Sequence, residues 1–290
     1  MSRRWSGEWG RRSEPDEPLL EVLIPTVDRP AELTATLAGL AAQDDPPFGV
    51  IVSDQSAPAP VWRAPAVAAM VRVLQAQGRP VRLLRRVPRR GLADQRQFLL
   101  DASSAPEVLF LDDDVWLEPG TLTRMHEALR ALDCGFVGCA VQGLSYLDDE
   151  RPQQQERFEP WPGVVVPERA RPGTEAFERW PLHNAANLAH IAARLPVERD
   201  GWVAYRIAWI GGCVLYDRAA LLEAGGFDFG VELPAAHAGE DVAAQWRVME
   251  RRGGAGLLPS GAVHLEAPTT VPDRDVDLAR LLPRLESRAG

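Results

Sequence analysis

The sequence contains no lysine, and all 32 of its basic residues are arginine. Without a side-chain amine, the chain cannot use Schiff-base chemistry or any mechanism that needs a catalytic lysine. Arginine is then the only permanent cation available for contacts with phosphate groups. An excess of positive charge is also missing, because the formal net charge is −9. This acidic balance argues against general binding of nucleic acid.

Cysteine is scarce, and long apolar runs are absent. The three cysteines, Cys134, Cys139 and Cys213, form no CxxC pair, so neither a disulfide framework nor a structural zinc site is predicted. No segment has the roughly 18 consecutive apolar residues that span a bilayer. The arginine-, glutamate- and proline-rich first 18 residues lack the apolar core of a signal peptide. We therefore expect a cytoplasmic protein without a transmembrane segment, with a peripheral membrane position as the alternative.

The composition that is present is that of an ordinary globular protein. Hydrophobic residues make up 46% of the chain and charged residues 25%. A chain of 290 residues can bury a sizeable core, either as one large α/β domain or as two small ones. The sequence does not predict the oligomeric state.

Apolar runs and helical patterns alternate through the first part of the chain. Strands are expected at residues 19–24, 50–54, 81–84 and 108–111, and helices at 31–42, 67–77 and 92–102. This order favours an α/β fold with a doubly wound, largely parallel sheet.

Regular patterns are weaker in the second part. A helix at 121–132 and a strand at 135–141 precede an irregular insertion at 143–208, which is rich in proline, arginine, glutamate and tryptophan. Further elements are a strand at 209–216 with two glycines inside it, helices at 218–224 and 239–252, and strand-like pieces at 256–258 and 262–265. Apolar residues also recur at helical spacing in 278–285.

Three consecutive aspartates, Asp112, Asp113 and Asp114, end the apolar run at 108–111. Adjacent carboxylates repel one another, so they are stable only in water or around a cation. The carboxyl end of a strand is where α/β sheets bind ligands. Asp112 and Asp114 would point the same way and share a divalent ion with phosphate ligands. The plain alternative is a solvated acidic turn.

The order of these motifs resembles the GT-A-fold glycosyltransferases of family two, over roughly residues 21–267. The matching segments are 24–30, 52–56, 89–97, 112–114, 225–228 and 239–241. The chain departs from the family pattern at Asp28 and Arg89, where asparagine is usual, and at Gln55, where aspartate is usual. The resemblance implies a Rossmann-like, mostly parallel sheet flanked by helices, with an acceptor-side subregion.

The resemblance also implies a division of the chain. Residues 1–18 would be a flexible tail, 19–267 the GT-A domain and 268–290 a C-terminal extension. Within the domain, 19–142 would bind the nucleotide sugar, and 143–267 would bind the acceptor and carry out catalysis.

Donor-binding roles follow from the same resemblance. Asp54 would accept a hydrogen bond from an N–H group of the base, and Asp28 would line the same pocket or shape the turn. Arg96 would face the charge of the nucleotide. Gly211 and Gly212 would let the backbone approach the donor sugar, the alternative being a bulge. The other residues expected to bind the nucleotide sugar are Pro25, Thr26, Asp112 and Asp113.

A diphosphate next to carboxylates requires a cation between them. Asp114 is the first expected ligand, and Asp112 would bind directly, through water or to the ribose. His264 resembles the late histidine that completes the metal site in several family members. Oxygen ligands suit Mn²⁺ or Mg²⁺, and a histidine ligand favours Mn²⁺.

The resemblance implies an inverting transfer with Asp241 as the general base and Glu240 orienting the acceptor. The plain alternative is that both acidic residues lie in the first turn of a helix only because their negative charge interacts favourably with the helix dipole. The expected donor is a UDP-sugar first and a GDP- or dTDP-sugar next. The acceptor would be a glycan, a lipid-linked sugar or a small molecule. Tryptophans in or beside the insertion would stack on sugars or pack in the core: Trp161, Trp180, Trp202 and Trp209.

Three other functions compete with this prediction. A non-catalytic relative that binds a sugar or a partner is the main alternative, because of the departures at Asp28, Gln55 and Arg89. A sugar nucleotidyltransferase should show an early glycine-rich loop and a lysine, and a haloacid-dehalogenase-type phosphatase also needs a lysine. The sequence offers neither feature.

Overall fold

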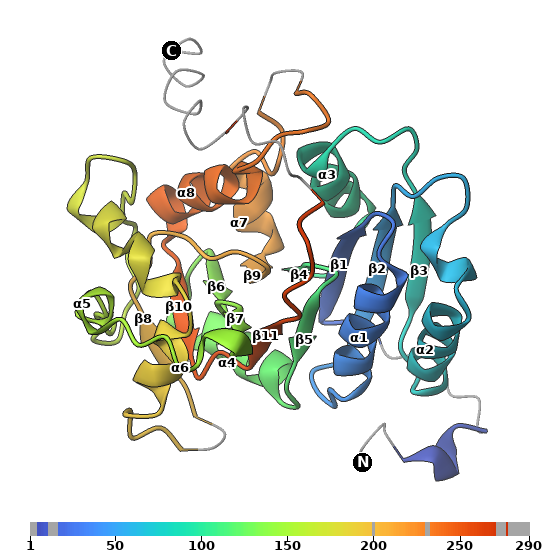
Figure 1. Ribbon diagram of the computed structural model, residues 1–290, viewed down its shortest axis with the longest axis horizontal. Coiled ribbons are helices and arrows are strands. Elements are labelled where there is room, and N and C mark those ends of the chain that lie inside the picture. The colour runs from blue at the N-terminus through green and yellow to red at the C-terminus, as the bar shows by residue number, and fades with distance from the viewer. Residues whose placement is uncertain (1–4, 11–16, 199–200, 230–232, 271–276, 278–290) are drawn as a thin grey trace.

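The computed structural model describes residues 5–10, 17–198, 201–229, 233–270 and 277. Its centre is an eight-stranded sheet with the strand order β3-β2-β1-β4-β9-β6-β10-β8 (Figure 1). The strands are β1 (Leu20–Thr26), β2 (Phe48–Asp54), β3 (Val81–Arg85), β4 (Glu107–Leu111), β6 (Phe136–Gly138), β8 (Val203–Tyr205), β9 (Cys213–Asp217) and β10 (Ala255–Leu258). All run in one direction except β9 and β8, which are antiparallel to their neighbours. The expected α/β fold with a mostly parallel sheet is confirmed.

A second, three-stranded sheet has the order β5-β11-β7. Its strands are β5 (Val115–Leu117), β7 (Gln142–Gly143) and β11 (Ala262–His264). The pairing of β11 with β5 sets His264 opposite Val115, the residue that follows the three aspartates. This small sheet therefore brings the late histidine beside the acidic turn.

Helices cover both faces of the large sheet. One face packs against α1 (Pro30–Ala41), α2 (Pro65–Ala76) and α4 (Thr121–Leu132), and the other packs against α3 (Leu92–Ala102), α7 (Arg218–Glu223) and α8 (Glu240–Arg252). In β1, Val22 and Ile24 join the first apolar cluster and Leu23 joins the second. Side chains alternate across a strand, so burial of both faces requires the continuous apolar run seen in the sequence.

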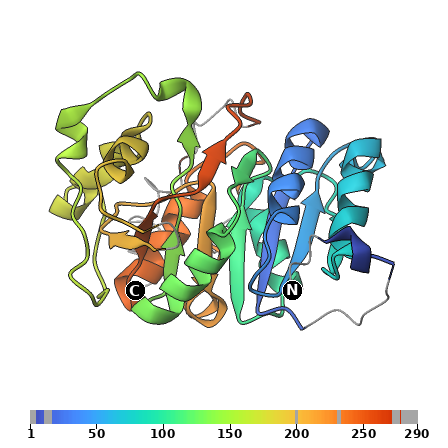
Figure 2. The same ribbon diagram turned by 90° about the horizontal axis from the view of Figure 1, so that it is seen from below.

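The irregular insertion forms a lobe beside β8 and β10, at the end of the sheet away from α1 and α2 (Figure 2). Its short helices are η3 (Leu144–Tyr146), α5 (Pro152–Gln155), η4 (Glu175–His183) and α6 (Asn187–Ala192). Two further 3₁₀ turns, η1 (Ser6–Glu8) and η2 (Val61–Arg63), lie nearer the N-terminus. The lobe is anchored by Leu182, Leu188 and Ile191, which are buried in the second apolar cluster.

Several predicted boundaries differ from the structure. The strand expected at 209–216 begins only at Cys213, because Gly212 has a φ of +79°, which an extended strand does not allow. The strand expected at 135–141 is reduced to Phe136–Gly138. Strands β5, β7 and β8 have two or three residues each and leave no usable pattern in the sequence. The helical spacing at 278–285 lies outside the described residues.

Within the described part of the chain, no helix combines the length and the apolar character that crossing a membrane would need.

Candidate functional site

A cleft of about 730 Å³ opens where β1 and β4 end. It is lined by the last residues of β1, the start of α3, the three aspartates, the start of α8 and the segment after β11. In Figure 1 that last segment, in dark red, runs between α8 and α3. The carboxyl ends of the parallel strands thus meet at a cavity, as is typical of α/β sheets.

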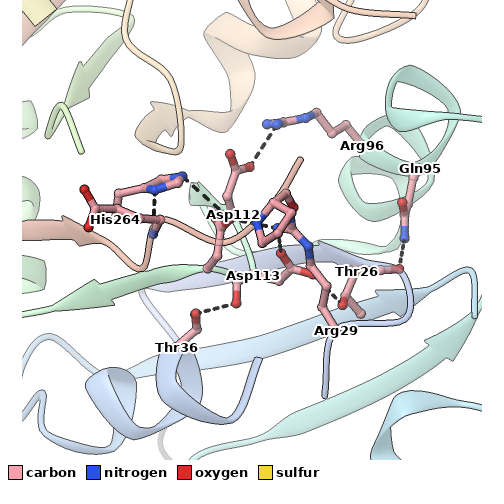
Figure 3. Close-up of polar contacts among 11 residues, drawn as sticks. Thr26, Arg29, Thr36, Gln95, Arg96, Asp112, Asp113 and His264 are labelled. Carbon is pink, nitrogen blue, oxygen red and sulfur yellow. Dashed lines mark hydrogen bonds and ion pairs between the residues drawn. The ribbon is translucent and has the colours of Figure 1, made fainter. Parts of the chain in front are cut away.

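Asp113 and Asp114 are both buried, whereas the side chain of Asp112 is partly exposed. Asp113 Oδ2 accepts a hydrogen bond from Thr26 Oγ1 at 2.6 Å, and its backbone carbonyl accepts one from Thr36 Oγ1 at 2.7 Å (Figure 3). Burial raises the pKa of Asp113 to about 7, against the opposing effects of Thr26 and Arg29. Asp113 therefore ties the turn after β4 to β1 and α1.

Arg29 holds two of the aspartates together. Its Nη1 lies 3.0 Å from Asp113 Oδ1 and 2.7 Å from Asp114 Oδ2, and its Nη2 donates to the carbonyl of Pro268. Burial lowers the pKa of Arg29, but the two carboxylates outweigh burial and raise it. The sequence analysis gave Arg29 no role, although an acidic triplet needs a nearby cation and Arg29 stands in a matching motif.

Arg96 forms a buried ionic cluster with Asp112 and Glu240. Its Nη2 lies 3.0 Å from Asp112 Oδ1 and its Nε lies 3.1 Å from Glu240 Oε1. Figure 3 shows Arg96 reaching from α3 to Asp112. The side chain of Glu240 is only 3% exposed, and burial, followed by the charge of Asp241, raises its pKa to about 7. Glu240 thus faces Arg96, and its predicted contact with the acceptor stays a prediction.

Asp241 is half-buried at the start of α8 and lines the cleft. Its Oδ1 accepts the backbone N–H of Val242 at 2.8 Å. A Cβ atom on Gly211 would stand 4.0 Å from Asp241 Oδ2, so this glycine borders the carboxylate. Burial raises the pKa of Asp241, Arg96 opposes the shift and Asp112 adds to it. The carboxylate is therefore more basic than an ordinary aspartate.

The predicted metal ligands lie close together but are engaged by other groups. Asp114 Oδ2 and His264 Nε2 are 3.6 Å apart, a separation that two ligands of one cation can have. The same oxygen contacts Arg29, and Nδ1 of His264 accepts the N–H of Glu266 at 2.8 Å. His264 would have to give up that hydrogen bond before Nε2 could bind a cation, because a neutral ring has one acceptor nitrogen.

No cluster of three or more histidine, cysteine or acidic side chains suited to an ion occurs among the described residues. Asp114 with His264 would supply two protein ligands. That is the usual number where phosphate oxygens and water complete a Mg²⁺ or Mn²⁺ site. The donor set therefore fits a cation held jointly with a diphosphate better than one held by protein alone.

Asp54 and Asp28 are absent from the described residues that line the cleft. Asp54 is fully buried, and its two carboxylate oxygens accept the N–H groups of Ser56 and Val61 at 2.8 and 2.9 Å. Asp28 is exposed at φ +56°, and its N–H donates to Ser56 Oγ at 2.7 Å. Both residues shape the loops near the base-binding region predicted from the sequence, and their contacts with a base stay predictions.

Two residues missed by the sequence analysis hold α3 in place. Gln95 Nε2 donates to the carbonyls of Ser53 and Thr26, at 2.6 and 3.2 Å. His237 Nε2 accepts the N–H of Ala93 at 3.0 Å, near the start of α3. No local pattern reveals either role, because each partner is distant in sequence.

Aromatic rings line the side of the cleft next to Asp241. Phe177 lies with its ring centroid 5.6 Å from Trp209 and 6.2 Å from Trp246, and all three residues line the cleft. Of the four tryptophans expected near an acceptor, only Trp209 is among these lining residues. Trp161 is buried beneath Arg206 at 3.7 Å and Trp202 packs against the first apolar cluster, whereas Trp180 is 41% exposed.

Comparison with known proteins agrees with this architecture. The family model for glycosyl transferase family 2 matches residues 21–193. S. aureus TarS 1–349 in complex with UDP-GlcNAc superposes with a TM-score of 0.52 at 17% identity, over 87% of this chain and 60% of that one. The mannosyltransferase PcManGT from Pyrobaculum calidifontis, in complex with GDP-Man and Mn²⁺, gives a TM-score of 0.54 at 15% identity, over 98% and 74%.

These identities show a shared fold and carry no residue roles. The chain spans 60% of S. aureus TarS 1–349 and 37% of the longer TarS structure. No curated protein sequence matches the chain.

Proposed function

The chain belongs to glycosyl transferase family 2, and from this premise we propose that it transfers a sugar from a nucleotide-diphosphate donor to an acceptor hydroxyl group. The observation that carries the proposal is the position of Asp241. Its carboxylate, with a raised pKa, lines the same cleft as the three aspartates that follow β4. A base and a diphosphate-binding region in one cavity are what glycosyl transfer from such a donor requires.

Asp241 acts as the general base in this proposal. It removes the proton of the acceptor hydroxyl group while that oxygen attacks the anomeric carbon. The bond from the anomeric carbon to the diphosphate breaks, and the nucleoside diphosphate leaves with the electron pair. Attack from the side opposite the diphosphate inverts the anomeric centre. A raised pKa improves Asp241 as a base, because a more basic carboxylate accepts the proton more readily.

The arginines position the carboxylates. Arg96 holds Asp112 and Glu240, so it fixes α3, α8 and the end of β4 relative to one another. Arg29 fixes Asp113 and Asp114. In water-restricted surroundings such paired charges keep their orientation, since separating either pair would leave a buried charge without a partner.

We further propose that Mn²⁺ or Mg²⁺ assists the reaction, with Asp114 as the first ligand, His264 as the second, and Asp112 bound directly, through water or to the ribose. When bound, the ion would neutralise charge on the departing diphosphate as a Lewis acid. The acidic cleft supports this assignment, since carboxyl groups outnumber guanidinium groups among its described lining residues and donor phosphates would add further negative charge. The Mn²⁺ in the PcManGT complex is consistent with such a site.

For the donor we propose a UDP-sugar first and a GDP- or dTDP-sugar next. Pro25 and Thr26, at the end of β1, line the cleft and would contact the nucleotide. The similar structures were solved with UDP-GlcNAc and with GDP-Man, so both bases are compatible with the fold.

A panel of UDP-, GDP- and dTDP-sugars tests the proposal. Binding is measured by calorimetry with and without Mn²⁺, and turnover by release of the nucleoside diphosphate. We expect Asp241→Asn to lower turnover by at least about 100-fold while donor binding is retained. Asp114→Ala should abolish the dependence of donor binding on Mn²⁺. Undiminished turnover in Asp241→Asn would remove it as the base.

A non-catalytic sugar-binding protein is the second candidate. The observation that favours it is that Arg29 and Arg96 already compensate the carboxylates of Asp112, Asp113 and Asp114. In that case the panel would show donor binding without turnover, whichever acceptor is supplied.

A further inference from the structure

Apolar side chains also line the cleft, among them Trp209, two residues before the glycine that borders Asp241, and Val242, which follows Asp241. Phe177, Trp209 and Trp246 form the aromatic wall, and Pro172 and Val242 complete this part of the lining. The ring of Phe177 lies between those of Trp209 and Trp246, at 5.6 and 6.2 Å, but Trp246 is only 1% exposed, so Phe177 and Trp209 are the rings that a ligand could contact. Trp209 is only half-buried, which leaves part of its ring available to a ligand.

The same side of the cleft offers no unpaired cation among the described residues. Arg29 and Arg96 are the permanent cations of the lining, and both are paired with aspartates. Arginines of the neighbouring lobe are paired with glutamates: Arg171 with Glu250 at 2.6 Å, Arg179 with Glu168 at 2.6 Å and Arg206 with Glu159 at 2.8 Å. Among these described arginines, an anionic ligand would find no guanidinium group that is not already paired with a carboxylate.

The lining as a whole is strongly acidic. Its described residues contain six carboxyl groups and two guanidinium groups: Asp112, Asp113, Asp114, Glu240, Asp241 and Asp277, with Arg29 and Arg96. Even without Asp113 and Glu240, whose pKa values are raised to about 7, four carboxylates face two guanidinium groups. The donor diphosphate adds further negative charge, which the proposed metal ion would compensate only locally. A phosphate or carboxylate group on the acceptor, placed next to Asp241, would be repelled by the carboxylates of the lining and by the donor diphosphate. Charges are only weakly screened inside a cleft, so this repulsion is large.

We propose that the acceptor is an uncharged pyranoside that lies flat against Trp209, with its reacting hydroxyl group toward Asp241. Aromatic faces bind the apolar C–H surface of a ring, and the polar rim of the ring is left to hydrogen-bond elsewhere. The aromatic side chains and the negative charge of the cleft lining disfavour acceptors that carry a phosphate or a carboxylate. This inference rests on the proposed function and adds the acceptor class to it.

Acceptor binding is tested first without any donor. Saturation-transfer NMR on the full chain compares the methyl glycosides of glucose, mannose and N-acetylglucosamine with their 6-phosphates. We expect saturation of the ring protons of at least one neutral glycoside, and dissociation constants at least tenfold higher for its 6-phosphate. Equal or tighter binding of the phosphates, or no binding of any neutral glycoside, would overturn the proposal.

Variants of Trp209 test the stacking contact. Trp209→Ala should weaken binding of the best neutral glycoside at least tenfold, and Trp209→Phe should restore most of it. Trp180→Ala is the matched control, because Trp180 is exposed and is not among the described residues that line the cleft. Equal effects of Trp209→Ala and Trp180→Ala would contradict the assignment. Thermal unfolding of each variant separates a lost contact from a lost fold.

A charge substitution tests the electrostatic half of the inference. Pro172 is exposed at this side of the cleft, so Pro172→Arg adds a cation there without disturbing a buried group. The preference for the neutral glycoside over its 6-phosphate should fall about tenfold, and an unchanged preference would count against the charge argument. Nucleotide-sugar binding, measured separately by calorimetry, shows whether the proposed donor function holds, so failure of the donor and failure of the acceptor class are distinguishable.

Discussion

At the scale of single residues, each aspartate that follows β4 is held by an arginine. Asp112 contacts Arg96, and Asp113 and Asp114 contact Arg29. In a chain without lysine these contacts use the only kind of permanent cation available. The carboxylate that a metal ion would need most, Asp114, is therefore already neutralised in the described structure. Binding of a divalent ion must compete with Arg29 for the same oxygen.

We expect Arg29→Met to strengthen binding of Mn²⁺ in the absence of donor. Removing the guanidinium leaves Asp113 and Asp114 without their cation, and a neighbouring unit charge at such a distance corresponds to about tenfold in affinity or more. The free Mn²⁺ concentration, measured by electron paramagnetic resonance, gives the dissociation constant. Arg86→Met is the control, because Arg86 pairs with Asp94. Unchanged or weaker binding in Arg29→Met would show that Arg29 does not occupy the cation position.

Glu240 gives a prediction about pH. Burial and Asp241 raise its pKa from 4.5 to about 7 in the folded protein. The folded state therefore holds a proton that the unfolded state has lost between these two values. By linkage, this group favours folding fully below pH 4.5, and its contribution is lost as pH rises toward 7.

Glu240→Gln removes this titration while retaining a similar shape. The free energy of unfolding of the original protein should therefore fall relative to the variant as pH rises from 4.5 to about 7. Urea unfolding at closely spaced pH values measures the difference. A difference that is constant over this range, or that changes in the opposite direction, would contradict the raised pKa.

At the scale of elements, the start of α3 depends on a close contact. Gly91 has a φ of +94°, and a Cβ there would lie 2.4 Å from His237 Cε1. Gly120 precedes α4 with a similar φ of +90°, but its Cβ would meet only Arg124 Nη1, at 3.9 Å. The two glycines share a positive φ but differ in ψ, which is 176° at Gly91 and −6° at Gly120, and in the space around them.

Comparing Gly91→Ala with Gly120→Ala measures the combined cost of the Gly91 backbone conformation and of its contacts with His237 and Ala235. Both variants adopt an unfavourable φ, but Gly91→Ala also takes a ψ that is essentially restricted to glycine and clashes with His237 and Ala235, so its free energy of unfolding should fall by about 1–3 kcal/mol more. Its affinity for the donor should fall as well, because α3 carries Arg96. Urea unfolding and calorimetry measure the two effects. Equal destabilisation by the two substitutions would mean that the loop around His237 moves aside at little cost.

The sequence predicted well the elements with a long apolar pattern, which are helices with one apolar face and strands that are apolar on both faces. The helix expected at 121–132 is α4 without any change of boundary, and the buried strands β1, β2 and β4 are within two residues of their expected positions. The short strands β5 and β7 were not predicted, because two or three residues are too few to show an alternating pattern of apolar and polar side chains. They exist only through pairing with β11, a contact distant in sequence.

The same division holds for the candidate site. The motifs placed Asp112, Asp113, Asp114, Asp241 and His264 among candidates that do line one cleft. They did not reveal that Glu240 is turned toward Arg96, or that the oxygens of Asp54 are used by its own loop. Which way a polar side chain points depends on neighbours brought in by the fold. A one-dimensional pattern identifies the residue but not its partner.

At the scale of the whole molecule, the two halves expected at 19–142 and 143–267 contribute to one sheet. Strand β9, from the second half, lies between β4 and β6 of the first half and pairs with both. Leu215 of β9 is opposite Leu109 on one side and Val137 on the other. Tyr216 of β9 also packs on Phe110 and Phe136, with ring centroids 6.1 and 5.4 Å apart. The two expected halves therefore share a core.

This shared strand predicts that the halves unfold together. A fragment of residues 17–142 would leave β4 and β6 without the strand between them and would expose Phe110 and Phe136, so we expect it to show no cooperative thermal transition. In the full chain, Leu215→Ala should lower the free energy of unfolding by about 2–5 kcal/mol, with circular dichroism and tryptophan fluorescence reporting the same midpoint. Leu222→Ala is the control, because this α7 side chain is 42% exposed and its loss should cost no more than about 0.5 kcal/mol. A cooperative transition in the fragment, or two separate midpoints in the Leu215→Ala chain, would show that the halves fold independently. The relative positions of Asp114 and Asp241 in the cleft would then depend on how two separate domains dock, and not on one continuous sheet.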